Sequence, residues 1–201
     1  MEGKKVDRRI LRTKMAIHEA FISLMNEKGF DATMVSDIAE RANINRGTFY
    51  VHYQDKFDLL EKTQSGIAEN IQKIFLQENN LNISDIYMVD KPLPIIVSFF
   101  EFLKENKNLM LAMFNLKGGM PFQTRIRQLI QENLKIEFVA GFNKNNFLVP
   151  SDYLISYAIS AHFGVVQDWL KRGCIETPEE MAIIFAKITC LGVLQCTGLT
   201  E

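Results

Sequence analysis

Apolar residues recur at spacings of three and four along one segment after another of this chain, and this recurrence constrains the fold most. Residues 9–27 show it clearly, as an amphipathic stripe that ends at Gly29. The other segments with this spacing lie at 34–42, 46–52, 56–77, 94–106, 108–116, 121–143, 151–172 and 178–196. Asn45 and Asp55 are predicted to cap the helices that begin at 46 and 56. No sustained period-two run flanked by hairpin turns occurs in the sequence. The sequence therefore predicts an all-α protein of about nine helices.

Composition and charge exclude several classes of protein. The chain has 201 residues, of which 47% are hydrophobic and 23% charged, which is typical of a globular domain with a buried core. A net charge of −1 argues against a uniformly basic nucleic-acid coat, but it allows a basic patch. The first 14 residues carry six basic and two acidic side chains, so they form either a solvated tail or an arm that contacts DNA.

The sequence also predicts the compartment and the absence of cofactors. No signal peptide is visible, and the most apolar window (181–196) contains Lys187 and is too short to cross a bilayer. The three cysteines form no CxxC pair, and the three histidines lie far apart. We therefore expect a cytoplasmic protein with reduced thiols, no metal site, no cofactor and no membrane partner.

Residues 45–56, NRGTFYVHYQDK, combine aromatic residues with polar and basic ones. A long helix, the short helix 34–42, a break at Asn43-Ile44 and the helix 46–52 are the layout of a helix-turn-helix unit. Phe49 and Tyr53 are four residues apart and share one side of the second short helix. With Ile38, Ala39 and Ile44 they are predicted to form a small core against the first helix.

The opposite side of helix 46–52 is predicted to contact DNA. Arginine pairs with guanine, threonine contacts a base edge or a thymine methyl group, and glycine lets the backbone approach the bases. Phosphate contacts are expected from the side chains that flank this helix. Two of these residues also have interpretations that involve no DNA. Lys56 can be a neutral surface residue, and Thr33 can be a simple N-cap. The predicted DNA-binding residues are Thr33, Asn45, Arg46, Gly47, Thr48, Tyr50, His52 and Lys56.

The segment from Ile10 to Leu60 resembles the DNA-binding domain of the TetR family of bacterial transcriptional regulators. The resemblance rests on AFISLMNEKGFDATMVSDIAERANINRGTFYVHYQDKFDLL, including its F-Y-x-H-[FY] ending. Asn43 stands where the family usually has glycine, and asparagine also tolerates the left-handed conformation. The resemblance implies a DNA-binding domain at 1–62, joined by a long helix to a helical effector-binding and dimerisation domain at 63–201. DWLKRG and the following TPEEM also resemble the C-terminal type common among Firmicutes members.

Aromatic and methionine side chains in the second half predict either a solid core or a small-molecule pocket. The candidate lining residues are Phe99, Phe102, Met110, Met113, Phe114, Phe122, Phe138, Phe142 and His162. No acidic cluster stands out, and Arg125 and Arg127 point in nearly opposite directions on one helix, so at most one faces inward. An apolar or amphipathic effector is therefore expected, whereas His162 on an apolar stripe is typical of a core or interface residue.

The last two helices, 151–172 and 178–196, predict a homodimer. They carry more apolar surface than a helix at the end of one chain can bury, and a second copy would cover it in a four-helix interface. The predicted interface residues are Leu154, Ala158, Val165, Trp169, Ile184, Ile188 and Leu191.

These features favour a ligand-responsive, homodimeric transcriptional regulator, usually a repressor, on a palindromic operator in double-stranded DNA. The alternative is a TetR-like coactivator that works through a protein partner and binds DNA weakly or not at all. An enzyme is disfavoured, because the sequence contains no GxGxxG, GxxxxGK[ST] or HExxH motif and no credible catalytic triad.

Overall fold

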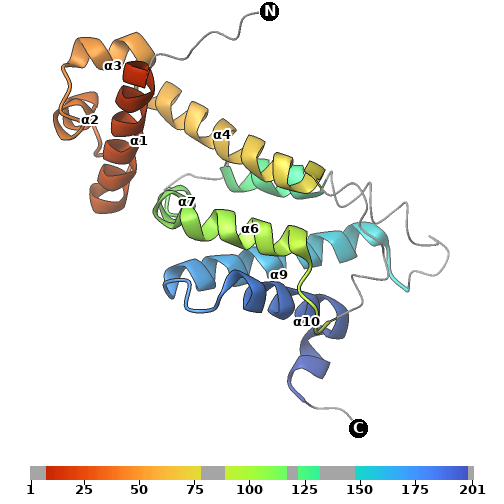
Figure 1. Ribbon diagram of the computed structural model, residues 1–201. Helices are drawn as coiled ribbons and strands as arrows, with labels where there is room; N and C mark the ends of the chain where they lie inside the picture. Colours follow the sequence, from red (N-terminus) through yellow and green to blue (C-terminus); the bar gives the residue numbers. More distant parts are fainter. Residues whose placement is uncertain (1–7, 78–88, 117–121, 132–147, 199–201) are drawn as a thin grey trace, which may run out of the picture. The chain divides into compact units, whose positions relative to one another are not determined.

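The computed structural model describes residues 8–77, 89–116, 122–131 and 148–198. Every regular element within these ranges is a helix, which confirms the predicted all-α class (Figure 1). The chain divides into two compact units. The first contains Met1–Gly66 and Asn108–Gly119, and the second contains Ile67–Lys107 and Met120–Glu201.

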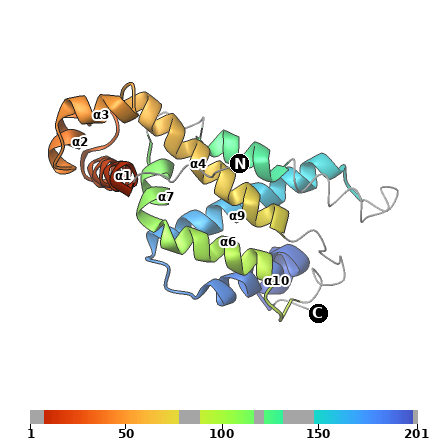
Figure 2. The ribbon, with the colours of Figure 1, turned by 45° about the horizontal axis from the view of Figure 1, so that its top comes forward.

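The first unit is a small helical bundle. It contains α1 (Arg8–Lys28), α2 (Val35–Arg41), α3 (Arg46–His52), the start of α4 (Lys56–Gln77) and α7 (Lys107–Phe114). α3 lies between α2 and the start of α4 (Figures 1 and 2). These helices bury one shared apolar core, made by Ile17, Ala20, Phe21, Leu24, Ile38, Ala39, Phe49 and Leu59. The bounds predicted for α3 and α4 are confirmed, and those for α1 and α2 agree to within one residue at each end.

The turn between α2 and α3 depends on one residue with a left-handed backbone. Asn43 has a φ of 52°, a conformation that asparagine adopts more readily than most residues. Ile44 then donates its backbone N–H to the Ala39 carbonyl at 2.9 Å, and its side chain is half-buried. The prediction that asparagine replaces glycine here without loss of the turn is confirmed.

The basic N-terminal segment is helical from Arg8 onward. Arg8, Arg9, Arg12 and Lys14 lie exposed on the first turns of α1. This part is therefore a helical extension and not a frayed tail, while residues 1–7 lie outside the described ranges.

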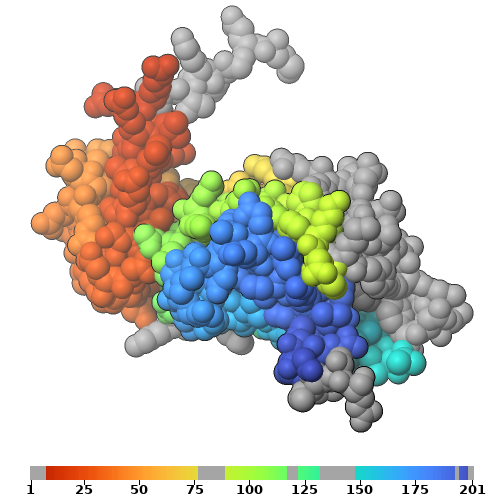
Figure 3. Space-filling view, turned by 60° about the horizontal axis from the view of Figure 1, so that its bottom comes forward, coloured from red at the N-terminus to blue at the C-terminus, as the bar shows by residue number. Residues whose placement is uncertain are grey.

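The second unit packs α6 (Pro94–Glu105), a helix at 122–131, α9 (Ser151–Lys171) and α10 (Pro178–Cys196). α6 packs along α10, and Figure 3 shows the two side by side in yellow-green and blue. The Phe100 ring of α6 makes edge contacts with Trp169 at 5.0 Å and with Phe185 at 4.7 Å between centroids. The bounds predicted for this helix, 178–196, are confirmed, but Gly192 has a φ of 68° and places a kink inside α10.

Two further predictions concern helix ends and membrane crossing. The helix predicted at 121–143 is described only from 122 to 131, so its later part lies outside the described residues. None of the described helices combines the length and apolar character that crossing a bilayer requires.

His162 joins α9 to α10. Its Nε2 lies 2.9 Å from Oγ1 of Thr189, which itself donates to the Phe185 carbonyl at 2.7 Å, so the imidazole Nε2–H is the donor to threonine. The ring stacks on Phe185 at 4.4 Å, and burial lowers the pKa of His162 to about 4. A neutral histidine with these contacts is a packing residue, which favours the core interpretation over the ligand one.

Lys56 fastens the start of α4 to the loop between α1 and α2. Its Nζ donates to the carbonyl oxygens of Phe30, Asp31 and Thr33 at 3.1, 3.0 and 2.9 Å. The ammonium group also lies over the Phe30 ring, 4.7 Å from its centroid. An ammonium group has three protons, so three carbonyls use its full donor capacity.

We predict that Lys56→Met destabilises the first unit. Methionine has a similar length but donates no hydrogen bond, so three carbonyls, two of them in part-buried hydrogen bonds, lose their shared partner, at a cost of about 1–3 kcal/mol. Urea denaturation of the full chain, followed by circular dichroism, measures this change. Lys73→Met is the control, because Lys73 is an exposed lysine of the second unit and its replacement leaves the contacts of the first unit unchanged. Equal, small effects of the two substitutions would contradict the role assigned to Lys56.

Candidate nucleic-acid interface

α3 has one buried side and one open side. Phe49 is fully buried and Tyr53, the residue after α3, is 5% exposed, so both belong to the core of the first unit. Arg46 and Gly47 are exposed, and the side chains of Tyr50 and Val51 are 56% and 78% exposed. The helix therefore presents a row of residues outward while its aromatic pair fixes its orientation.

The N-terminal end of α3 is held by Asn45. Its Oδ1 accepts hydrogen bonds from the Thr48 backbone N–H at 2.7 Å and from the Thr48 hydroxyl at 3.0 Å. A Cβ at Gly47 would lie 3.2 Å from the same oxygen, so glycine gives this cap the room it needs. The prediction that Asn45 is the N-cap of α3 is confirmed. Because Oδ1 makes the cap, the Nδ2 amide group is the part of this side chain that can still donate hydrogen bonds.

The C-terminal end of α3 is connected to α4 by a turn that Asp55 and Asp58 stabilise. Oδ1 of Asp55 accepts from the backbone N–H groups of Phe57 and Asp58, each at 2.8 Å, which confirms its predicted capping role. Oδ2 of Asp58 accepts from the Gln54 N–H at 2.9 Å and from Nζ of Lys62 at 2.8 Å, and this ammonium group holds the pKa of Asp58 below its ordinary value. The connection from α3 to α4 is thereby fixed on both sides.

Tyr53 is supported by residues that the sequence did not single out. His18 of α1 meets the Tyr53 ring edge-on with centroids 6.4 Å apart, and the Lys62 ammonium lies 5.2 Å from the centre of the same ring. His18 Nε2 is 3.4 Å from the Thr63 hydroxyl, and burial lowers the pKa of His18. Because these partners come from α1 and α4, no local pattern around α3 predicts them.

Charges near α3 are partly neutralised by ion pairs. Lys28 pairs with Asp37 at 2.6 Å, and Arg41 pairs with Glu27. Within the described part of the chain, Arg46 has no acidic partner. Its exposed guanidinium group is therefore available to an anion or to the acceptor edge of a base.

Two predicted contacts are revised. Thr33 is fully buried and donates its hydroxyl to the Gly29 carbonyl at 2.8 Å, so its side chain is not placed to reach a phosphate. It is not the N-cap either, because Met34 precedes α2 and donates its N–H to Oδ2 of Asp37 at 2.9 Å. The ammonium group of Lys56 serves three carbonyls, which gives this residue a structural role in place of the expected phosphate contact.

The remaining predicted DNA contacts lie together on α3 and its N-cap. Asn45, Arg46, Gly47 and Tyr50 are exposed, whereas Thr48 and His52 are half-buried. Their contact with DNA stays a prediction. Val51, the most exposed large apolar residue of α3, was absent from the predicted set.

The predicted pocket residues that the structure describes are divided between the two units. Met110 and Met113 are buried in the first unit, which also contains Phe114, while Phe122 is buried in the second. The second unit also contains Phe99, Phe102 and His162. Phe138 and Phe142 lie outside the described residues, and the pocket stays a prediction.

The predicted interface residues divide into one buried residue and a half-exposed group. Trp169 is only 2% exposed and donates Nε1–H to the Glu176 carbonyl at 3.2 Å, so it is a core residue of its own chain and its assignment is revised. Leu191 is 36% exposed. The half-buried members are Leu154, Ala158, Val165, Ile184 and Ile188.

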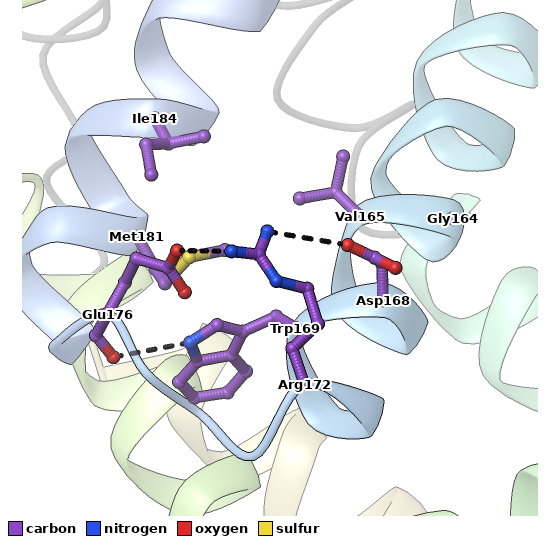
Figure 4. A pocket seen from close by; sticks show the side chains of 8 residues that line it. All are labelled: Gly164, Val165, Asp168, Trp169, Arg172, Glu176, Met181 and Ile184. Atoms are coloured by element: carbon purple, nitrogen blue, oxygen red, sulfur yellow. Dashed lines mark hydrogen bonds and ion pairs between the residues drawn. The ribbon is translucent and has the colours of Figure 1, made fainter.

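A groove of about 340 Å³ runs between α9 and α10 (Figure 4). Val165 and Ile184 line it from the two helices. At its other end Arg172 lies 3.7 Å from Asp168 and 3.5 Å from Glu176, so its polar wall is internally paired. The groove thus combines open apolar side chains with an ion-paired wall of one basic and two acidic side chains.

Two family comparisons match most of the described helices. Residues 17–63 match the family described as bacterial regulatory proteins, tetR family, and this range contains α2 and α3 entirely. Residues 90–189 match a family described as a transcriptional regulator C-terminal region.

Two curated relatives carry the resemblance further. The chain is 33% identical over 168 residues to the biofilm operon icaADBC negative transcriptional regulator IcaR of Staphylococcus epidermidis, covering 75% of this chain and 87% of that protein. It is 35% identical over 121 residues to the HTH-type transcriptional regulator YxbF of Bacillus subtilis, covering 59% of this chain but only 30% of YxbF.

Solved structures share the fold over nearly the whole length. A TetR transcriptional regulator from Streptococcus agalactiae covers 91% of this chain and 96% of its own, with a TM-score of 0.59 and 22% identity. The regulator FadR of Bacillus subtilis, solved in complex with stearoyl-CoA, covers 89% and 98%, with a TM-score of 0.61 and 16% identity. Together with the match to IcaR and the helix-turn-helix geometry, these findings show that the chain belongs to the TetR family of bacterial transcriptional regulators.

Proposed function

We propose that this protein is a homodimeric repressor that inserts α3 into the major groove of a palindromic operator. The observation that carries the proposal is the division of α3 into a buried side, with Phe49 and Tyr53, and an open side that begins at Arg46. A helix held in this way can enter the groove without losing its own packing. Binding to chromosomal DNA would place the protein in the cytoplasm.

Repression is supported by the name of IcaR, which describes that protein as a negative transcriptional regulator. The alternative of a coactivator with little autonomous DNA binding gains no support from the relatives. The open side of α3, with an unpaired Arg46, also favours direct DNA binding.

We propose that a second copy covers the groove between α9 and α10. Val165, Ile184 and Ile188 are half-buried and Leu191 is 36% exposed, which is an unusual amount of aliphatic surface for adjacent helices. A two-fold interface would bury these side chains against their own symmetry mates and set the separation of the two α3 helices.

We also propose that the second unit binds an amphipathic small molecule through Arg127. Nη1 of Arg127 donates to the Ser160 hydroxyl at 3.0 Å, and its guanidinium carbon lies 5.0 Å from the centre of the Phe163 ring. Arg125 is exposed, so Arg127 is the arginine of this pair that packs against α9. A half-buried guanidinium beside the Phe163 ring fits a ligand with an anionic head and an apolar tail. The stearoyl-CoA complex of FadR shows that this fold accommodates such a molecule.

Arg46→Ala is expected to weaken operator binding and relax its sequence preference. Loss of one arginine–base contact costs on the order of 1–3 kcal/mol. The operator is obtained by in vitro selection with the full chain, and affinity is measured by fluorescence anisotropy. Lys73→Ala, which removes an exposed cation from the second unit, is the control and should leave affinity unchanged. An Arg46→Ala protein with unaltered affinity and preference would overturn the assignment of α3.

For the interface, Ile184→Asp is expected to convert the dimer into monomers, because the two-fold interface would then bury two unpaired carboxylates, one from each copy. Sedimentation at micromolar concentration should give about twice 23.1 kDa for the wild type and the monomer mass for the variant. Ile175→Asp is the matched control, since Ile175 is 70% exposed in the connection between α9 and α10 and away from the groove. A monomeric wild type would refute the dimer.

For the effector, single-chain carboxylates and stearoyl-CoA are expected to raise the melting temperature and to release operator DNA. Arg127→Leu should reduce both effects, because the anionic head loses its partner. Thermal shift and anisotropy on the same samples measure them, with Lys73→Ala as the control. Stabilisation only by divalent metals or by phosphorylated metabolites that lack an acyl chain would count against this effector class.

A further inference from the structure

Val51 is an exposed apolar residue in the middle of a polar surface. Its side chain is 78% exposed, more than that of any other large apolar residue that the structure describes in the first unit. Neither the core nor the helix accounts for it, because valine contributes no burial here and is a weaker helix former than alanine or leucine. The residue is therefore a candidate for contact with something outside the chain.

Gly47 opens the surface beside Val51. The two residues are four positions apart, so they are neighbours on the same face of α3. Helical side chains lean toward the N-terminus and cover the preceding turn, which places Val51 over position 47. Because Gly47 has no side chain, the helix backbone at this position is uncovered on the face that also carries the Val51 methyl groups, and we call this pair of residues the notch.

The chemistry of the major groove identifies what fits this notch. Base edges in the groove carry hydrogen-bond donors and acceptors, and the thymine C5-methyl is the apolar group among them. Polar neighbours flank the notch, since Arg46 and Tyr50 are both exposed. An apolar notch between polar side chains therefore matches a methyl group that lies between hydrogen-bonding base edges.

We propose that Val51 and Gly47 form a specificity-determining contact with one thymine methyl group in each operator half-site. The proposal rests on the proposed function, because it requires α3 to lie in the major groove. It adds a rule that polar contacts alone do not supply: at one position thymine is preferred over any base that lacks the methyl group. Under this proposal Arg46 recognises the hydrogen-bonding groups of a base edge, and Val51 recognises the shape of the thymine methyl group.

Replacing thymine by deoxyuridine removes only the methyl group and keeps base pairing, so it tests the contact directly. The full chain is first used to select an operator in vitro, and each thymine is then replaced in turn. For the wild type, one position per half-site should lose about three- to fivefold in affinity, the effect of burying one methyl group. Val51→Ala should bind the normal operator more weakly and should show no loss on deoxyuridine replacement at that position.

Two controls separate this contact from a general loss of binding or of folding. Ile175→Ala trims an exposed apolar side chain in the second unit and should keep the full deoxyuridine effect. Circular dichroism of Val51→Ala should match the wild type, because alanine is a good helix former.

The possible outcomes distinguish failure of the proposed function from failure of the Val51 contact alone. If the wild type selects no DNA, the proposed function fails. If it selects an operator but no thymine responds to deoxyuridine, or if Val51→Ala keeps the response, DNA binding stands and the Val51 contact is overturned. Loss of the response in Val51→Ala alone supports the contact.

Discussion

The structure depends first on the burial of Phe49 and Tyr53 beneath α3. Helix α3 has only seven residues, too few to hold its conformation in isolation, so its orientation comes from packing. With these two aromatic side chains in the core, the rotation of the helix is set, and Arg46, Gly47, Tyr50 and Val51 face outward. Asn45 and Asp58 then fix the two ends, so the open side is a rigidly presented surface on an otherwise short element.

The second unit differs from the first, because its helices are long and pack against one another. The Phe100 ring holds Trp169 and Phe185 in one aromatic cluster, which joins α6, α9 and α10. The apolar side chains that this cluster leaves uncovered, Ile184 among them, line the groove between α9 and α10. The same packing that builds the unit thus creates the surface proposed to pair two copies.

The sequence predicted features whose causes are local. The caps at Asn45 and Asp55 and the left-handed Asn43 depend on residues within three positions, and each is confirmed. Lys56 was misjudged because its carbonyl partners lie 23 to 26 residues away. Trp169 was assigned to the dimer interface because nothing in its own helix shows that Phe100 covers it within one chain. Periodicity and capping patterns carry no information about contacts between residues that are distant in the sequence.

The central claim is that the open side of α3 contacts DNA. Amide chemical shifts of the ¹⁵N-labelled full chain, recorded during titration with the selected operator, test it most directly. The account predicts the largest changes at residues 45–52, with the core positions around Leu59 little affected. Changes concentrated on α9 and α10, with α3 unchanged at saturating operator, would contradict it.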